Sequence, residues 1–209
     1  MVESGLAGVA VFSHPCNDAV LTGTFPVAAL RCLELGRFVL LDHVGFNGET
    51  WLLARCFELL RRDGFRGVVA FSDPVPRSTS DGRLVFPGHL GVIYQASSAR
   101  YLGRGTARML RLLPDGRVLS DRALSKLRVP GDRPRPRGWR YAAGLLAEAG
   151  ADPAPAEGCG DLAAWAALWV SRLTRPLRHP GNHKYAFALD RRLRPLLPAS
   201  RAYPKTPAA

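Results

Sequence analysis

Four side chains that can move protons lie close together near the middle of the chain. Ser72 and Asp73 follow an apolar segment, and His89 and Tyr94 come within the next 21 residues. A carboxylate or hydroxyl can accept a proton from an attacking amine, and a phenol can donate one. Since ligands bind at strand ends in open α/β sheets, we predict that these four residues form a catalytic centre. Each also has a structural interpretation, for instance Asp73 as a turn former before Pro74.

A second candidate site lies between a predicted strand and the helix that follows it. A strand that passes through a glycine turn into a helix presents free backbone amides and the positive end of the helix dipole. These groups bind anions. We therefore predict a site for a cofactor or group donor, although capping of the helix alone would explain the same residues. The residues concerned are Gly45, Asn47, Gly48, Glu49 and Thr50.

The elements that must position these residues form an α/β unit. Apolar runs predict strands at 8–12, 37–42 and 67–71, and the second run, without a polar interruption, is expected to be buried on both faces. Apolar residues at helical spacing predict a helix at 51–61, which Gly64 ends. Strand, glycine turn, helix and strand in this order indicate one α/β unit.

The rest of the chain carries weaker signals. Residues 90–96 could form a strand or one helical face, and the Asp-Gly turn at 115–116 predicts a hairpin. Beyond these we expect helices at 121–127, 139–149 and 162–173, the last capped by Asp161, and a strand at 185–189. We predict two parts: a core at 1–138, and at 139–209 an alanine-rich helical and basic, Pro- and Arg-rich extension that packs on the core or is tethered to it.

The charge of the chain points to a polyanionic partner. There are 29 lysines and arginines against 17 aspartates and glutamates, a formal net charge of +12, and the sequence pI is about 10.5. A GC-rich genome would explain why arginine replaces lysine, but it would not explain the basic excess. Between Arg128 and Arg137 prolines alternate with arginines, which predicts an extended loop suited to phosphate contacts. A merely solvated basic loop is the alternative.

Composition also excludes several classes of protein. With 47% hydrophobic and 22% charged residues the chain can bury a core, and no apolar run approaches a membrane span. The N-terminus lacks the pattern of a secretory signal, so we expect a cytoplasmic protein. The four cysteines contain no C-x-x-C pair, and we interpret them as reduced core residues and predict no metal site.

The motifs taken together resemble the Mom family of phage DNA modification proteins, which are divergent members of the GNAT acyltransferase superfamily. The resemblance spans roughly residues 8–128 and rests on these segments: 40–50, 69–74, 88–96, 101–103 and, as a further echo, 182–185. It implies an α/β, GNAT-like fold with a mixed central sheet flanked by helices. We expect this fold to lack the usual N-terminal helix and strand and to carry a helical, basic C-terminal extension.

The resemblance implies a transferase that adds a carbamoylmethyl-type group to the N6 amine of adenine in double-stranded DNA, protecting phage DNA from restriction in a bacterial host. The donor is a small molecule that the residues do not identify, with acetyl-CoA or a related acyl donor as one candidate. An enzyme acting on a base inside a duplex must extrude it, and Tyr101 or Trp139 could stack against the gap. The predicted DNA-binding residues are Tyr101, Arg128, Arg133, Arg135, Arg137, Lys184, Arg191 and Arg192.

Two rival functions remain open on the sequence. One is an ordinary acyl-CoA N-acyltransferase that acts on a small amine or a protein. The other is a non-catalytic DNA-binding protein built on the same scaffold, which would bind DNA in a salt-dependent manner without needing Asp73 or Tyr94.

Overall fold

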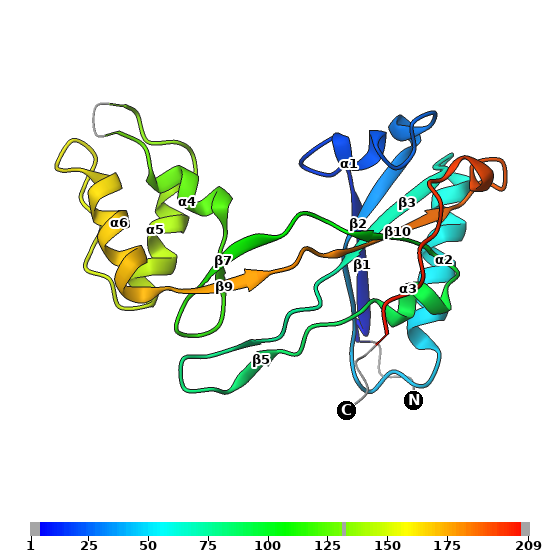
Figure 1. The fold of residues 1–209 in the computed structure, drawn as a ribbon, viewed down its shortest axis with the longest axis horizontal. Coiled ribbons are helices and arrows are strands. Elements are labelled where there is room, and N and C mark those ends of the chain that lie inside the picture. The colour runs from blue at the N-terminus through cyan, green and yellow to red at the C-terminus, as the bar shows by residue number, and fades with distance from the viewer. Residues whose placement is uncertain (1–4, 131–132, 206–209) are drawn as a thin grey trace. The chain divides into compact units, whose positions relative to one another are not determined.

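A computed structural model describes residues 5–130 and 133–205 of the chain (Figure 1). It divides into two compact units, and the chain passes between them four times. Unit 1 comprises residues 1–74, 89–106 and 181–209, and unit 2 comprises residues 75–88 and 107–180. The sequence predicted a boundary between two parts at residue 138, and this boundary stays a prediction. The two compact units of the structure divide the chain at other positions.

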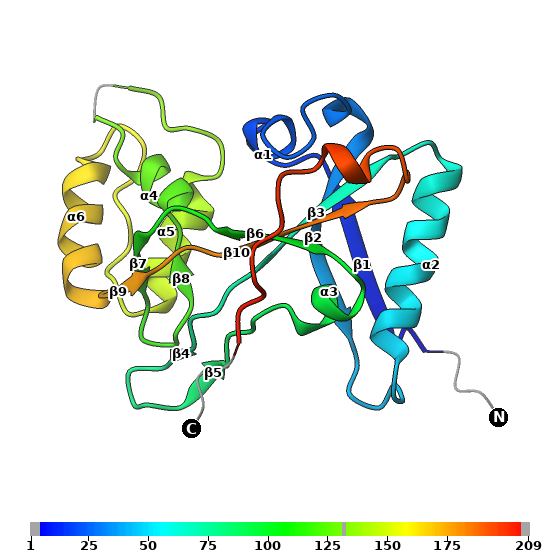
Figure 2. The ribbon, with the colours of Figure 1, turned by 45° about the vertical axis from the view of Figure 1, so that its right-hand side comes forward.

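Unit 1 is a mixed five-stranded sheet with short and long helices. In chain order its elements are β1 (Gly8–Ser13), α1 (Ala19–Thr22), the 3-10 helix η1 (Ala29–Arg31), β2 (Cys32–Leu40), α2 (Gly48–Arg62), β3 (Gly67–Ser72), α3 (Val92–Ala96), β6 (Arg100–Arg104), β10 (His183–Ala188) and the 3-10 helix η2 (Arg194–Leu196). The strand order is β1-β2-β3-β10-β6, in which β2 and β3 are parallel and the other neighbours are antiparallel (Figure 2).

Two apolar clusters cover the two faces of this sheet. On one face Leu53 and Phe57 of α2 and Tyr94 of α3 pack against side chains of β3 and β10. On the other face Leu21 and Phe25, from α1 and the turn after it, pack with side chains of the same strands. Burial of apolar side chains on both faces stabilises the sheet at about 25 cal/mol per Å² of apolar surface. The centre of the sheet is therefore rigid enough to position side chains at its edge.

Unit 2 combines two small sheets with three helices (Figure 2). Its elements are β4 (Arg77–Ser78), β5 (Leu84–Phe86), β7 (Arg108–Leu112), β8 (Val118–Leu119), α4 (Asp121–Leu127), α5 (Trp139–Glu148), α6 (Leu162–Leu173) and β9 (Arg175–His179). β4 pairs with β5, and the second sheet has the order β8-β7-β9. The three helices bury an apolar cluster of their own, so each unit has a separate core.

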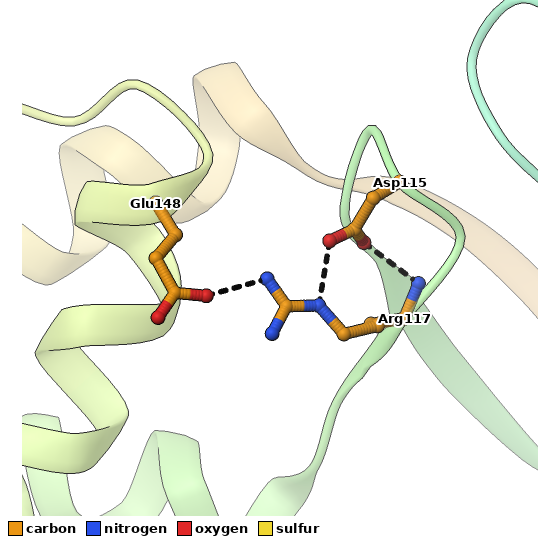
Figure 3. A network of polar contacts seen from close by, with 3 residues as sticks. All are labelled: Asp115, Arg117 and Glu148. Atoms are coloured by element: carbon orange, nitrogen blue, oxygen red, sulfur yellow. Dashed lines mark hydrogen bonds and ion pairs between the residues drawn. The ribbon is translucent and has the colours of Figure 1, made fainter.

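An ion-pair network ties the β7–β8 turn to α5 within unit 2 (Figure 3). The Arg117 guanidinium donates to Asp115 across the turn at 2.5 Å and to Glu148 on α5 at 2.7 Å. All three side chains are about half exposed. Such pairs contribute roughly 0 to 1 kcal/mol each, so the apolar cluster rather than this network holds the unit together.

Local sequence signals predicted several elements correctly. Helix α2, strand β3 and helix α4 lie where expected, α6 begins after Asp161, whose side chain accepts from Ala163 N and Ala164 N, and residues 90–96 contain a helix. One expectation was wrong: β2 is not buried on both faces, because beyond Leu35 its side chains alternate between half-buried and exposed, and Val39 is 50% exposed. Cys16 and Cys159 are exposed and are not core residues.

A glycine is required where two backbone segments meet in unit 1. Gly181 has φ +96°, and a Cβ at this position would lie 2.1 Å from the carbonyl oxygen of Gly105. The same segments are joined by a hydrogen bond of 2.9 Å from Gly105 N to Asn182 O. An alanine would therefore meet both backbone strain and a clash that no side-chain movement relieves.

We predict that Gly181→Ala destabilises the protein by more than about 2 kcal/mol. Gly150→Ala is the matched control, because Gly150 has φ +106° but no atom lies within 4 Å of the place that a Cβ would take, so it should cost only about 1 kcal/mol. Urea unfolding of both variants measures the difference. Equal losses would show that the approach of Gly105 and Gly181 does not constrain the fold.

Candidate functional site

Two of the predicted catalytic residues meet at the carboxyl end of β3. Ser72 is the last residue of the strand and is fully buried, and Asp73 follows it half-buried. The chain then enters unit 2 at Val75 and returns at His89, whose backbone N donates to Asp73 O at 2.7 Å. The 16-residue gap between Asp73 and His89 in sequence is thus closed in space.

The His89 imidazole is close enough to other charged groups to be influenced by them. Its side chain reaches the surface, but desolvation lowers its pKa, against the opposing attraction of the carboxylates of Asp73 and Glu49. A lowered pKa keeps this imidazole uncharged at neutral pH. His89 therefore presents an uncharged imidazole near the carboxylate of Asp73.

Tyr94 lies in a cluster of aromatic rings rather than at the surface. It is 5% exposed, and its ring centroid is 6.5 Å from that of His89 and 5.4 Å from that of Tyr185. Gly91 precedes its helix with φ +70°, and a Cβ there would lie 2.8 Å from both tyrosine rings. Burial, followed by the nearby Tyr185 and Glu49, raises the pKa of Tyr94 to about 12. The phenol therefore stays protonated at neutral pH and cannot serve as a base.

The structure adds β10 residues to this centre that the sequence did not single out. Tyr185 is fully buried, its hydroxyl donates to Leu90 O, and Gln95 Nε2 donates to the same hydroxyl at 3.4 Å. Burial raises the pKa of Tyr185, and the Gln95 amide and then the Ser72 hydroxyl oppose this rise. The sequence predicted a strand at 185–189, and the resemblance covered 182–185, but neither assigned a catalytic role to Tyr185.

His183 is the second residue that sequence analysis missed. It is 1% exposed and pairs in register with Ser72 on β3. A hydrogen bond of 2.7 Å joins its Nδ1 to the hydroxyl of Tyr101 on β6. Burial, and then the charges of Arg104 and His89, lower the pKa of His183. A second uncharged imidazole therefore lies at the carboxyl end of β3.

The burial of Tyr101 and Trp139 does not favour the prediction that either ring stacks against DNA. Tyr101 is 7% exposed and its hydroxyl is bonded to His183, while Trp139 is 9% exposed in the core of unit 2. Neither ring has a free face for a base. The aromatic character of both residues suggested stacking, but burial depends on long-range packing that the sequence did not reveal.

The five residues predicted to hold a cofactor or donor line one cavity of about 450 Å³. The cavity lies between the end of β2, the turn into α2 and the first turn of α3. Asn47 adopts the left-handed conformation with φ 69° and its side chain does not cap the helix, whereas Thr50 Oγ1 donates to Asn47 O at 2.9 Å. Helix capping therefore does not account for the Asn47 side chain.

The polar character of this cavity does not fit a pyrophosphate. Its lining includes the carboxylates of Asp42 and Glu49, and no Lys, Arg or His lies among the described residues that line it. Glu49 already occupies the first turn of α2, where the helix dipole favours negative charge. A CoA pyrophosphate would meet two carboxylates without a compensating cation, so the residues fit a neutral or cationic ligand instead.

The predicted DNA-binding residues fall into two groups. The first group makes hydrogen bonds within the protein. Arg135 donates to Pro155 O at 2.6 Å and to Ala156 O at 2.9 Å. The half-buried Lys184 donates to Val20 O at 3.4 Å. The exposed residues are Arg128, Arg133 and Arg137 in unit 2 and Arg191 and Arg192 in unit 1. Residues 131 and 132 of the predicted basic loop lie outside the described residues.

Neither a metal centre nor a membrane span is found in the part of the chain that the structure describes. Residues 5–130 and 133–205 contain no group of three or more His, Cys, Asp or Glu side chains able to hold a metal ion. No helix in the same ranges is long and apolar enough to span a membrane.

Fold and site together define a mixed α/β protein with acid–base side chains at a strand end. The model of the Mom protein family matches residues 2–137, which is more than half of the chain, and the chain belongs to this family. Membership supports a general role in phage DNA modification. No curated protein matches the chain.

We predict that acetyl-CoA at about 1 mM changes the melting temperature by less than about 1 °C, because the cavity carboxylates repel its pyrophosphate. The double variant Asp42→Asn, Glu49→Gln removes that repulsion and should show the larger shift of the two proteins. Differential scanning fluorimetry measures both. A rise of several degrees in the unaltered protein would contradict this electrostatic account and favour an acyl-CoA transferase.

Proposed function

We propose that this protein transfers a small carbon group, of the carbamoylmethyl type, from a small-molecule donor to the N6 amine of adenine in DNA and so protects phage DNA from restriction. The observation that carries the proposal is the backbone hydrogen bond from His89 to Asp73, which brings the two residues together at the end of β3, inside the region matched by the Mom family model. The Asp73 carboxylate is also near enough to act on the pKa of the His89 imidazole. A transferase acting on an amine needs acid–base groups at one point.

A GNAT-like arrangement of unit 1 is supported by the way β2 and β3 diverge. They pair as parallel strands only over Cys32–Leu35 and Gly67–Ala70, although both continue further. The divergence lies at their carboxyl ends, and α2, which connects them, begins at the cavity. Ligands bind where parallel strands separate in α/β sheets. We therefore assign the 450 Å³ cavity to the donor, with a neutral or cationic head group.

The proposed reaction follows from the groups at the end of β3. The Asp73 carboxylate accepts a hydrogen bond from the N6 amine and holds it toward the donor carbon. A nitrogen–carbon bond forms, the bond between that carbon and its leaving group breaks, and the amine gives up one proton to a base at the same edge. Tyr94, which stays protonated, is assigned as a hydrogen-bond donor at the site.

DNA as the partner is supported by the distribution of charge. Unit 2 contains 15 lysines and arginines and 8 aspartates and glutamates, which leaves it +7 of the total +12. Contacts between basic side chains and DNA phosphates position a protein on the duplex without reading the base sequence. We assign them to the exposed arginines of the loop before α5, Arg133 and Arg137, rather than to Arg135.

The first test compares the unaltered protein with Asp73→Asn. Asparagine keeps the shape of the side chain but cannot carry the negative charge, so modification should fall by at least about 100-fold while DNA binding changes less than about twofold. Mass spectrometry of nucleosides and a fluorescence anisotropy titration measure the two quantities. Normal modification by Asp73→Asn would remove Asp73 from the mechanism.

The second test concerns the DNA contacts. Replacing Arg133 and Arg137 together by alanine should weaken binding to all duplex sequences alike and reduce the slope of log K against log salt by up to about 2. Arg135→Ala is the matched control, which should lower stability through its lost carbonyl contacts but leave the salt slope unchanged. An unchanged slope in the double variant would place the phosphate contacts elsewhere.

A further inference from the structure

Three buried polar atoms at one end of β10 have no hydrogen-bond partner among the described residues. They are Ser72 Oγ, Asn182 Oδ1 and His183 Nε2. Polar atoms shielded from water are nearly always paired in native proteins, and the exceptions call for an explanation such as a catalytic role. Here the three atoms belong to adjacent or register-paired residues beside the proposed reacting centre.

The three side chains Ser72, His183 and Tyr101 form an ordered series across the sheet. Ser72 and His183 are direct partners in the antiparallel β3–β10 ladder, so their side chains lie on the same face with Cβ atoms about 5 Å apart. On the other side of the imidazole, a hydrogen bond of 2.7 Å joins the Tyr101 hydroxyl oxygen to Nδ1 of His183. A hydroxyl, a base and a group that orients the base are the parts of a proton-transfer chain.

We propose that His183 accepts the proton released in the transfer reaction, through the Ser72 hydroxyl, and that Tyr101 is its positioning residue. The inference rests on the proposed function. Ser72 Oγ and His183 Nε2 are not hydrogen-bonded to each other in this structure, so the relay requires them to close to hydrogen-bond distance when the substrate binds. As the new nitrogen–carbon bond forms, the amine proton then passes to Ser72 Oγ while the Ser72 proton passes to His183 Nε2. The leaving group departs with the electrons of its bond. This requires the tautomer in which Nδ1–H donates to the Tyr101 oxygen and Nε2 carries a lone pair.

The surroundings of His183 suit a proton acceptor at neutral pH. The titratable or charged groups on the elements around it are Arg100, Tyr101 and Arg104 on β6, Lys184 and Tyr185 on β10, Asp73 after β3, and His89. Burial, Arg104 and His89 disfavour its protonated form, whereas Lys184 turns to α1 and contacts Val20 O. The imidazole is therefore uncharged before the transfer and has a lone pair with which to accept a proton.

The variant His183→Asn isolates the Nε2 atom. Asparagine places a polar atom near the position of Nδ1 and so keeps a partner for Tyr101, but it has no equivalent of Nε2. We expect the single-turnover rate of DNA modification to fall by at least about 100-fold with unchanged DNA affinity and melting temperature. His14→Asn, at an exposed histidine outside the site, is the control and should keep the full rate. A full rate in His183→Asn would overturn the proposal.

A second measurement is independent of turnover. Nitrogen-15 NMR of the histidine side chains should show His183 as the Nδ1–H tautomer, with its pKa below the usual value. Tyr101→Phe removes the acceptor that stabilises the imidazolium, so this pKa should fall further and the rate should level off at a lower pH than in the unaltered protein. The Nε2–H tautomer would overturn the relay even if the protein modifies DNA. If no DNA is modified but the Nδ1–H tautomer is found, the proposed function fails and the proton-accepting arrangement stands.

Discussion

The antiparallel pairing of β3 with β10 is the constraint on which the candidate site depends. It joins residues more than 100 positions apart in the chain and sets Ser72 opposite His183. Side chains alternate between the two faces of a strand, so a slip of one residue would turn His183 away from Ser72 and from Tyr101. The slip would also expose Tyr185 and Phe187, which are buried in the same cluster. The apolar core therefore fixes the register that brings the polar groups together.

In the proposed account, unit 1 carries the chemistry and unit 2, whose segments interrupt unit 1 in the sequence, carries the phosphate contacts. The first of the two segments of unit 2, residues 75–88, leaves unit 1 just after Asp73 and returns at His89, so this segment begins and ends at the proposed reacting centre. Each unit buries its own apolar cluster, and the larger basic excess lies in unit 2. The region matched by the Mom family model, residues 2–137, contains elements of both units. Chemistry in one unit and phosphate contacts in the other are consistent with this arrangement.

Sequence patterns predicted what depends on neighbouring residues and missed what depends on distant ones. Asp161 as the cap of α6, Gly64 after α2 and the Asp-Gly turn before β8 are local signals, and the structure confirms them. The roles of His183 and Tyr101 depend on strand pairings across 82 residues of chain, which no local pattern encodes. Asp42 and Glu49 made the acidic character of the cavity assigned to the donor visible in the sequence, but only the fold shows that both line the same cavity.

Nucleoside mass spectrometry of plasmid DNA from cells that express this chain, in a host that lacks its own adenine methylation, tests the central claim most directly. The account predicts a new deoxyadenosine species whose added mass stays on the base after fragmentation and maps to N6. The same species should be absent from cells without the chain. Unmodified nucleosides in the presence of folded protein, or an added mass on another base, would contradict the account.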